Sequence, residues 1–454
     1  MKSQRIAVVT LDTLTARMAG PAIRAWEISR VLSESGHAVR LLTFSKCERQ
    51  GTGFTAARVT VDGFRGEVKA ADILIMQGYL LETFGWIRNA NCAVVIDLYD
   101  PFHLESLEVD KFRSQPERHA SLDRAVNELR AEVERGDFFL CASERQRDLW
   151  MGHLAAWGRL NPDTYDADPS LRSLIDVAPF GCGSEPPVQT RHGIRGVVPG
   201  IAEDDKVVIW GGGVYNWFDP LTVVEAVDIA RAEVPDLRLF FLGMKHPNPD
   251  VPEMAMANRV RLESDRRGLT GVHVFFYHDW VEYEDRGNYL LDADVGISAH
   301  FDHVETSYSF RTRMLDYLWA GLPIVCSEGD SFGALVAERH IGVAIPVSDA
   351  AAMARALVML LSDMQVARDT RDRVRDVATE FHWEKALLPL VEFCAAPHRA
   401  ADFARLTAGQ VTQPMPWRAR FRRDAVGTVR ALASGGLPEA AHKIRWRVAR
   451  ILQR

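Results

Sequence analysis

The sequence predicts an α/β protein of two domains, each built on a doubly wound parallel sheet, with a basic helical tail at the C-terminus. The chain has 454 residues, and a single hydrophobic core stops growing at about 250 to 300 residues. Short β-rich runs alternate with longer helical patterns, which is typical of βαβ units. A segment rich in proline and glycine, residues 179–187, interrupts this alternation, and a second strand–turn–helix pattern begins at residue 206.

The strands are expected where short apolar runs are bounded by turn residues. In the first half they lie near residues 5–10, 38–44, 72–76, 92–97, 137–142 and 175–179, and in the second near 206–210, 237–242, 272–276, 294–298, 323–327 and 342–345. The prolines and glycines between the two sets cannot continue a helix or an interior strand. We therefore place a linker at about 180–200 and predict domains at 1–185 and 186–380.

The composition indicates a soluble globular protein. Hydrophobic residues make up 47% of the chain and charged residues 25%, as in ordinary globular domains. No apolar run approaches the roughly 20 residues that span a bilayer, and the run at 6–10 is too short for the core of a signal peptide. The six cysteines lack the spacing of a zinc site. We expect a cytoplasmic protein with reduced thiols and no metal site.

The C-terminal end differs in charge from the rest of the chain. Residues 395–454 contain twelve Lys or Arg and three acids, a local net charge of +9, whereas the whole chain carries −7. Aromatic and basic residues interleave around Trp417 and Trp446, as in helices that lie on an anionic membrane. A tail at 398–454 is predicted to bind such a membrane surface or, as an equal alternative, to pack on the acidic body of the protein. No nucleic-acid partner is expected.

The turn after the first strand argues against two common nucleotide-binding classes. A dinucleotide-binding domain would carry G-x-G-x-x-G there, but residues 10–20 lack these glycines, and no G-x-x-x-x-G-K-[ST] motif occurs anywhere. Instead, Gly20 and Pro21 open a helix. Its free amides would face a ligand at the carboxyl edge of the sheet, unless the turn only places the helix on the sheet.

The second half contains a glycine loop directly after its first strand. Gly211, Gly212 and Gly213 are adjacent, and such a run lets backbone amides approach an anion closely. A purely structural turn rarely needs three glycines, so a phosphate or sugar site is favoured here.

Residues 305–325 predict a loop, a helix, a glycine stop and a strand. Ser309 or Thr312 can cap the helix, and Gly321 can end it. The first helical turn would then present amides to an anion at the edge of the sheet.

Charged side chains near this helix suit a nucleotide. Arg311 and Arg313 provide forks for a diphosphate, but they are expected on different faces, so that one reaches it, preferably Arg311. Asp316 can accept hydrogen bonds from a ribose diol or form a helical ion pair with Arg313. Lys245, at the end of another strand, is either the second choice for the diphosphate or a surface lysine.

The first half has a polar cluster of its own at a strand end. Asp97, Asp100, His103 and Glu105 follow an apolar strand. Carboxylates and an imidazole at such a position suit acceptor binding or proton transfer, although a lone histidine is more often structural.

Taken together, these motifs resemble glycosyltransferase family 4. The helix and strand at 315–325 are similar to the family's signature segment, residues 19–21 to its N-terminal glycine loop, 143–144 to the end of its first lobe, and 177–181 to its interdomain hinge. The similarity covers about residues 5–395.

The resemblance implies a GT-B fold, in which two Rossmann-like domains face a central cleft. It implies a nucleoside-diphosphate sugar held by the C-terminal domain, an acceptor held by the N-terminal domain, and a crossover helix at about 381–397. Transfer would retain the anomeric configuration without a metal or other cofactor, because amides and basic side chains stabilise the leaving diphosphate. Trp280 and Val281 would lie near the base, and His103 or Asp100 beside the transferred sugar.

The sequence departs from the family pattern in the donor site. The family's two acids stand eight residues apart; the second is Asp316 here, but Tyr308 occupies the first position, and Glu305 is the candidate substitute. The cations that follow the family's glycine loop are replaced by Gly213 and Phe218. Another cation must therefore neutralise the diphosphate.

The predicted site residues form three groups. Catalytic candidates are Asp100, His103 and Arg311. The donor site is expected to contain Gly212, Gly213, Lys245, Trp280, Val281, Glu305, Tyr308, Ser309, Phe310, Arg311, Thr312 and Asp316. The loop on the acceptor side comprises Ala19, Gly20, Pro21 and Arg24.

The predicted function is that of a retaining, metal-independent, hexosyltransferase-like glycosyltransferase. Its acceptor would be a glycan or lipid-linked glycan of cell-envelope polysaccharide, lipopolysaccharide or glycolipid synthesis, and it would be cytoplasmic or peripheral at the inner face of the cell membrane. Two alternatives stay open. One is a nucleotide-sugar epimerase of the GT-B fold, and the other is a non-catalytic nucleotide-sugar-binding partner protein, which the absent acid at Tyr308 would suit.

Overall fold

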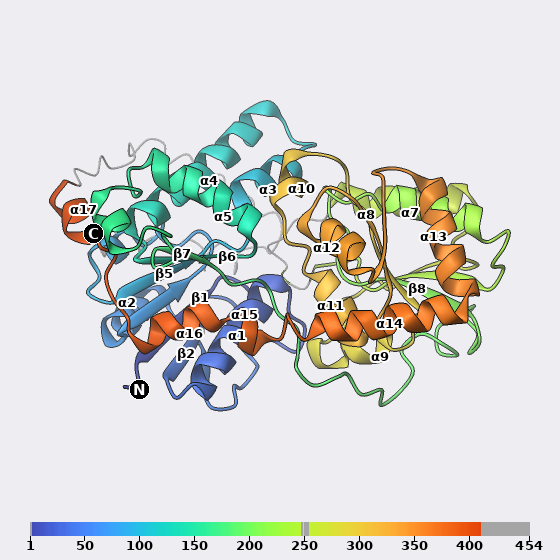
Figure 1. Ribbon diagram of the computed structural model, residues 1–454, viewed down its shortest axis with the longest axis horizontal. Helices are drawn as coiled ribbons and strands as arrows, with labels where there is room; N and C mark the ends of the chain where they lie inside the picture. Colours follow the sequence, from blue (N-terminus) through green and yellow to red (C-terminus); the bar gives the residue numbers. More distant parts are fainter. Residues whose placement is uncertain (1, 247, 249–253, 410–454) are drawn as a thin grey trace, which may run out of the picture.

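A computed structural model describes residues 2–409 apart from 247 and 249–253. The molecule consists of two α/β halves that lie side by side along its long axis (Figure 1). Each half contains one parallel sheet packed against helices. The predicted fold class of two parallel-sheet domains is therefore confirmed. The predicted basic tail lies outside the described residues from 410 onward.

The first sheet has seven strands in the order β3-β2-β1-β4-β5-β6-β7. The strands are β1 (Arg5–Thr10), β2 (Ala38–Thr43), β3 (Thr55–Arg58), β4 (Ile73–Met76), β5 (Ala93–Asp97), β6 (Phe138–Cys141) and β7 (Ile175–Val177). Sequence reasoning found all of them except β3. This edge strand has four residues, TAAR, and pairs with β2 alone, so it carries none of the large apolar side chains by which buried strands are found.

The second sheet has the six predicted strands in the order β10-β9-β8-β11-β12-β13. They are β8 (Lys206–Trp210), β9 (Leu237–Phe241), β10 (Val274–Phe276), β11 (Val295–Ser298), β12 (Ile324–Ser327) and β13 (Gly342–Ile345). In both sheets the chain reverses its direction of winding, between β1 and β4 and between β8 and β11. Ligands bind outside the carboxyl ends of strands at such points.

Helices connect the strands in both halves. In the first half they are α1 (Gly20–Glu34), α2 (Val61–Ala70), η1 (Gly85–Asn89), α3 (Phe102–Val109), α4 (Gln115–Arg135), α5 (Glu144–Ala156) and α6 (Pro162–Ala167). In the second half they are α7 (Pro220–Ala230), α8 (Ala255–Arg266), η2 (Tyr283–Asp285), α9 (Arg286–Leu290), α10 (Val304–Tyr308), α11 (Arg313–Ala320), α12 (Ser331–Arg339), α13 (Ala350–Ser362) and α14 (Met364–Ala378).

After α14 the chain returns to the first half. The short helix α15 (Trp383–Ala386) lies beside α1 and is followed by α16 (Leu388–Ala395) and α17 (Phe403–Gly409) (Figure 1). Phe393 of α16 stacks on Phe138 of β6 with ring centroids 4.7 Å apart. Asp402, before α17, is fully buried and forms an ion pair of 2.9 Å with Arg159.

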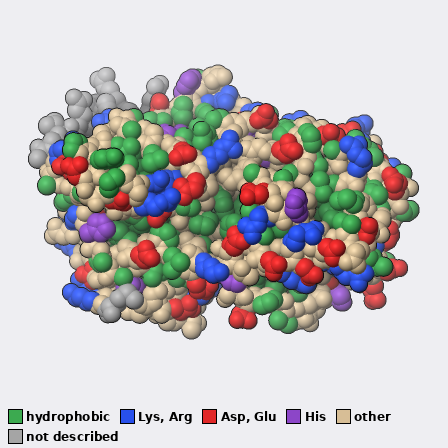
Figure 2. Space-filling view, viewed as in Figure 1, with side chains coloured by type: hydrophobic (Ala, Val, Ile, Leu, Met, Phe, Trp, Pro, Cys, Tyr) green, Lys and Arg blue, Asp and Glu red, His purple; other side chains and the backbone are tan. Residues whose placement is uncertain are grey.

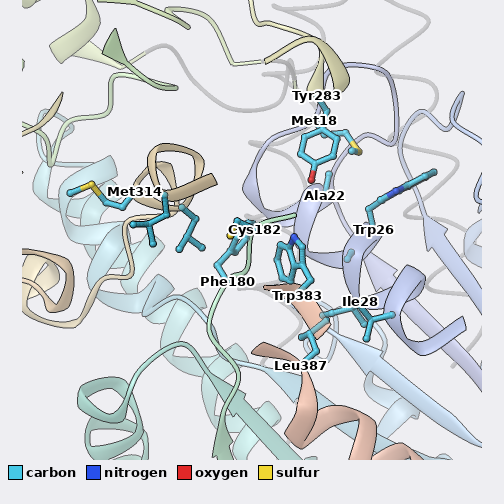
Figure 3. Packing of buried hydrophobic residues seen from close by; sticks show 14 of the residues in the cluster. Met18, Ala22, Trp26, Ile28, Phe180, Cys182, Tyr283, Met314, Trp383 and Leu387 are labelled. Carbon is cyan, nitrogen blue, oxygen red and sulfur yellow. The ribbon is translucent and has the colours of Figure 1, made fainter. Parts of the chain in front are cut away.

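The hydrophobic core continues across the junction of the two halves. One cluster of buried side chains contains residues of both sheets, of α1 and of α15. Figure 3 shows Trp383 close to Phe180 and Cys182 of the connecting segment; the rings of Phe180 and Trp383 are 4.9 Å apart. The connection between the halves is thus packed at its start, around Phe180 and Cys182, whereas most of residues 184–192 are exposed.

Among the helices that the structure describes, no single one is long and apolar enough to cross a membrane. The neighbouring helices α13 and α14 pass that test only as a pair, and they are bent by 97° relative to each other. All six cysteines are free thiols.

Gly181 is expected to be intolerant of a side chain. A Cβ atom there would lie 2.6 Å from the indole ring of Trp383 and 2.9 Å from its Cα atom, so Gly181→Ala should lower stability by about 1 to 3 kcal/mol. The control is Gly152→Ala in α5, where a Cβ would meet nothing within 4 Å and helix propensity favours alanine by about 1 kcal/mol. Thermal unfolding of both variants checks this; equal melting temperatures would contradict the packing.

Candidate active site

A cavity of about 510 Å³ lies between the two halves. Its first wall is formed by the loop after β1, the start of α1, and the segment from Tyr99 into α3. Its second wall is formed by the loops after β8, β9, β10 and β11 and by the start of α11. We call this cavity between the two walls the cleft.

Figure 2 shows acidic and basic side chains interspersed over both halves of one face of the molecule.

Most of the predicted site residues line the cleft. They are Ala19, Gly20, Pro21, Asp100, Gly212, Gly213, Trp280, Val281, Glu305, Ser309, Phe310, Arg311, Thr312 and Asp316. Four predicted residues do not line it: Arg24, His103, Lys245 and Tyr308.

Arg24 is a structural residue, contrary to its assignment to the acceptor-side loop. Its side chain is fully buried and forms a two-pronged ion pair with Asp97 of β5, at 2.6 and 2.8 Å. It also donates hydrogen bonds to the carbonyl oxygens of Ala178 and Pro179. The position of Arg24 within the first turns of α1 directs it down into the sheet rather than toward the cleft.

His103 does not line the cleft, contrary to the expectation that it would lie beside the transferred sugar. On α3 the residues that line the cleft are Glu105 and Val109, four positions apart, with Pro101 before the helix. A residue two positions from Glu105 lies on the opposite face of a helix. His103 instead packs against Trp150 at 5.5 Å between ring centroids, and burial lowers its pKa to about 4.

Tyr308 and Lys245 are also placed outside the cleft. Tyr308 is the last residue of α10, and its carbonyl oxygen accepts a hydrogen bond from Gln146 of the first half, while its ring lies near Arg145. Lys245 is exposed and lines a neighbouring cavity together with Lys46. The structure therefore assigns neither residue to the donor cleft.

The glycine loop after β8 presents its backbone to the cleft. Gly212 has φ +116°, which favours glycine, and a Cβ at Gly213 would lie 2.7 Å from the Tyr215 ring. The amide of Gly211 is not free to bind a ligand, because it donates a hydrogen bond to the Tyr317 hydroxyl at 2.8 Å. Gly212, which is half-buried, and Gly213, which is buried, both line the cleft.

Arg311 is neutralised by a carboxylate. Its guanidinium donates to both oxygens of Glu305, at 3.0 and 2.9 Å, and its Nε lies 3.8 Å from Asp330. Coulombic attraction and hydrogen bonds from Arg311 outweigh burial and hold the pKa of Glu305 below its ordinary value. Glu305 thus lies at the cleft, as expected of a substitute acid, but its charge is already paired with Arg311.

Arg313 has no such partner. Its guanidinium is buried, stacks over the rings of Trp210 at 4.3 Å and Phe218 at 4.0 Å, and donates one hydrogen bond to the carbonyl oxygen of Gly213 at 2.8 Å. Its Nη1 has no hydrogen-bond partner, and the described residues provide no ion pair for it. Burial, together with repulsion from Arg311, lowers the pKa of Arg313 to about 10.

The two arginines lie closer together than sequence reasoning predicted. Helix α11 begins only at Arg313, with Thr312 as its N-cap residue, so Arg311 precedes the helix and helical spacing does not apply to it. Both guanidinium groups line the cleft, and Arg311 also lies over Phe218, at 5.0 Å. Both residues thus line the same cavity, and which of them binds a diphosphate stays a prediction.

Asp316 is paired across helices. Its carboxylate accepts a hydrogen bond of 3.0 Å from Arg286 at the start of α9, not from Arg313. Arg286 in turn stacks on Tyr283 at 3.8 Å and on Trp319 at 4.3 Å. Asp316 keeps contact with the cleft, so it can still accept a hydrogen bond from a ligand hydroxyl.

Trp280 joins the two walls. Its indole N–H donates to the carbonyl oxygen of Met18, in the loop after β1 of the first half, at 3.0 Å. Its ring borders the cleft and lies 5.5 Å from that of His246. The indole face remains at the cleft while the indole nitrogen is committed to the protein.

Asp292 and Asp294, which precede β11, bind the linker. Asp292 accepts hydrogen bonds from the amides of Gly193 and Ile194, both at 2.7 Å, and Asp294 pairs with Arg195 at 2.6 Å. These carboxylates therefore have a structural role on the face of the second half that carries the linker.

The second half of the chain is similar to a known protein family. Residues 205–363 match the family model described as glycosyl transferases group 1. This stretch is therefore similar to the group 1 glycosyltransferases. It contains the glycine loop, Glu305 and both cleft arginines, Arg311 and Arg313. No curated protein sequence matches the chain.

Solved structures share the two-domain arrangement at low sequence identity. Sucrose-phosphate synthase from Thermosynechococcus elongatus is 17% identical, with 90% of this chain and 100% of that chain covered and a TM-score of 0.60. WaaG, a glycosyltransferase involved in lipopolysaccharide biosynthesis, is 14% identical, with 86% and 100% covered and a TM-score of 0.61. HepE from Anabaena, in complex with UDP-glucose, is 12% identical, with 87% and 100% covered and a TM-score of 0.58. The chain shares the GT-B fold of these structures.

Sequence reasoning did not select several cleft residues. Arg286, Tyr283 and Tyr215 line the cleft, but no motif marks them. Glu105 could have been selected from the sequence, because it follows Asp100 within one polar cluster. However, only the position at which α3 begins shows which side chains of this cluster share a helix face. Arg313 was noticed, but its lack of a counter-charge is a property of the folded chain.

The two carboxylates on the first wall are unusual in their environment. Burial, and repulsion from Asp97 and Glu305, raise the pKa of Asp100 to about 7. Burial, and repulsion from Asp100 and Glu305, raise the pKa of Glu105 well above its ordinary value. Neither side chain has a hydrogen bond or ion pair within the described residues, and both line the cleft.

The raised pKa of Asp100 predicts that stability falls as the pH rises. Between its ordinary value of 3.8 and about 7, the folded state holds a proton that the unfolded state has lost, so the free energy of unfolding decreases with increasing pH across this window. Asp100→Asn should raise the melting temperature at pH 8 and leave it nearly unchanged at pH 4.5, an effect on the order of 1 kcal/mol. Thermal unfolding of both proteins from pH 4.5 to 8 measures this; parallel curves would contradict it.

Proposed function

We propose that the protein is a glycosyltransferase that moves a sugar from a nucleoside-diphosphate sugar, bound by residues 205–363, to an acceptor bound on the first wall of the cleft. The observation that carries this proposal is the guanidinium of Arg313, which is buried at the cleft beside the glycine loop without a counter-charge. A buried charge is costly unless it is paired. An anionic ligand between Arg313 and the backbone of the glycine loop would supply the missing charge.

A nucleoside diphosphate fits this half of the cleft by its chemistry. Arg313 and the amides of the glycine loop suit the diphosphate, Asp316 can accept hydrogen bonds from a ribose, and Trp280 offers a ring face next to the base. Structures of the same fold hold UDP-glucose, as HepE does. We assign Arg311 a structural role in this wall, because its charge is already paired with Glu305.

We further propose transfer with retention and without a bound metal. The residues that would stabilise the charge on the leaving diphosphate are preorganised donors: the Arg313 guanidinium and the loop amides, in a site from which much of the water is excluded. The proposed acceptor remains a glycan or lipid-linked glycan of cell-envelope synthesis. A link to a membrane surface would depend on residues 410–454, which lie outside the described structure.

One observation favours an alternative function. Asp100, Glu105 and Glu305 surround the same cleft, and an epimerase acting on a nucleotide sugar would need carboxylates near the sugar ring. Product analysis separates the possibilities. Sugar attached to an acceptor supports transfer, a sugar nucleotide of changed configuration supports epimerisation, and tight binding without turnover supports the non-catalytic binding protein.

Nucleotide binding is the first expected result. A ligand that binds only the folded state raises its stability by mass action, by about 2.7 kcal/mol at a concentration of 100 times Kd. Thermal-shift titration with UDP, GDP, ADP, dTDP and their sugars should therefore give a clear shift for one base. If every nucleotide left the melting temperature unchanged, the donor-site proposal would be wrong.

Arg313→Met separates an anion site from a structural arginine. The substitution keeps much of the apolar volume over Trp210 and Phe218 but removes a buried charge that has no partner, so the melting temperature of the free protein should stay equal or rise. Affinity for the nucleotide found above should fall by about 2 kcal/mol, roughly 30-fold. Isothermal titration calorimetry measures this.

The control for that variant is Arg261→Met, on α8 and outside the cleft. It should bind the nucleotide as the wild type does. A large loss of stability in Arg313→Met, with unchanged affinity, would assign Arg313 to the scaffold.

A further inference from the structure

The first wall of the cleft carries carboxyl groups that have no ion-pair partner among the described residues. Asp100 and Glu105 line the cleft without a hydrogen bond or ion pair among the described residues. Behind them, Glu132 of α4 is 1% exposed, and neither of its carboxylate oxygens has a partner. Helix α4 packs on α3, and burial, together with repulsion from Glu128, Asp100 and Asp97, raises the pKa of Glu132 well above its ordinary value.

The cations of this region are already occupied. Arg24 is committed to Asp97 and to two backbone carbonyl oxygens. Across the cleft, Arg311 is held by both oxygens of Glu305. Arg24 attracts Asp100 and Arg311 attracts Glu105, but each guanidinium is hydrogen-bonded to another carboxylate. Within the part of the chain that the structure describes, no side chain forms an ion pair with Asp100, Glu105 or Glu132.

Glu128 differs from these three carboxylates. It lies on α4, as Glu132 does, and it accepts hydrogen bonds from two backbone amides, those of Leu81 and Glu82. It is therefore satisfied by neutral donors, and the unsatisfied carboxylates are the ones that face or back the cleft.

The two walls of the cleft carry ionisable groups of opposite kind. The second wall presents the unpaired guanidinium of Arg313 beside the glycine loop, and the first presents Asp100 and Glu105. A diphosphate would be repelled by the first wall, so the occupant of that wall is the acceptor rather than the donor.

The chemistry of the first wall narrows the acceptor class. Hydroxyl groups of a neutral sugar can donate hydrogen bonds to a carboxylate, but they leave the repulsion among neighbouring carboxylates in place. An ammonium group both donates hydrogen bonds and supplies the opposite charge, and charge-assisted hydrogen bonds are the stronger kind.

We propose that Asp100 and Glu105, backed by Glu132, bind an ammonium group of the acceptor, so that the acceptor is an amine-bearing sugar or aminocyclitol. The inference rests on the proposed function, in which this wall holds the acceptor. The amine positions the acceptor, and one of its hydroxyl groups receives the sugar.

The test compares matched ligands that differ in their amines. Glucosamine is compared with glucose, and 2-deoxystreptamine with myo-inositol. Calorimetry measures the binding of each ligand to the full chain. The nucleotide identified by thermal shift is present in these measurements, or is left out if no nucleotide binds. We expect each amine to bind at least tenfold more tightly than its neutral counterpart. This preference should shrink as the salt concentration rises, because it depends on charge.

Isosteric variants locate the binding group. Asp100→Asn and Glu105→Gln should each weaken 2-deoxystreptamine binding at least tenfold and leave nucleotide affinity unchanged. Glu132→Gln should weaken the amine preference at a melting temperature no lower than that of the wild type. Glu134→Gln is the control, because Glu134 lies on α4 but is paired with Arg88 and Arg130. It should behave as the wild type does.

The outcomes distinguish this inference from the proposed function. Equal binding of amine and neutral ligands, or amine binding that survives in both Asp100→Asn and Glu105→Gln, overturns the inference while nucleotide binding still supports a glycosyltransferase. If no nucleotide binds but 2-deoxystreptamine does, in a manner dependent on Asp100, the amine site stands and the donor assignment fails.

Discussion

The guanidinium of Arg24 joins three parts of the chain that are far apart in sequence. It lies in α1, pairs with Asp97 at the end of β5, and donates to the carbonyl oxygens of Ala178 and Pro179 where the first half passes into the linker. A buried ion pair is stable only when its remaining hydrogen bonds are also satisfied, and here they are. The first wall of the cleft, which begins with the loop before α1 and continues from β5 into α3, is therefore held at a constant position relative to the connection between the halves.

Charge is distributed in the cleft so that most groups are paired and a few are not. Glu305 neutralises Arg311, and Arg286 neutralises Asp316, so these residues shape the wall. Arg313 is left without a counter-charge, and the carboxyl groups of the opposite wall have no ion-pair partner among the described residues. Because burial makes an unpaired charge costly, each unpaired group favours the binding of a ligand of opposite charge. The two walls are consequently suited to different ligands.

Much of the fold could be predicted because buried parallel strands are continuous apolar runs. Twelve of the thirteen strands were found in this way, and β3 was missed because a short edge strand is not buried on both faces. The glycine loop and Gly321 were also predicted, since a left-handed or close-packed backbone requires glycine; Gly321 has φ +67°. The site was predicted to the level of its loops, because ligands bind at the carboxyl ends of strands.

The sequence by itself determined the two parallel sheets, the loops that meet between them, and the residue types available in those loops. Only the tertiary structure decided which of those side chains reach the cleft and which charges are paired. His103 and Glu105 are two residues apart, yet the start of α3 turns one toward Trp150 and the other toward the cleft. The physical reason is that orientation depends on where each helix begins, and that a counter-charge such as Glu305 for Arg311 is set by packing, which local sequence patterns do not encode.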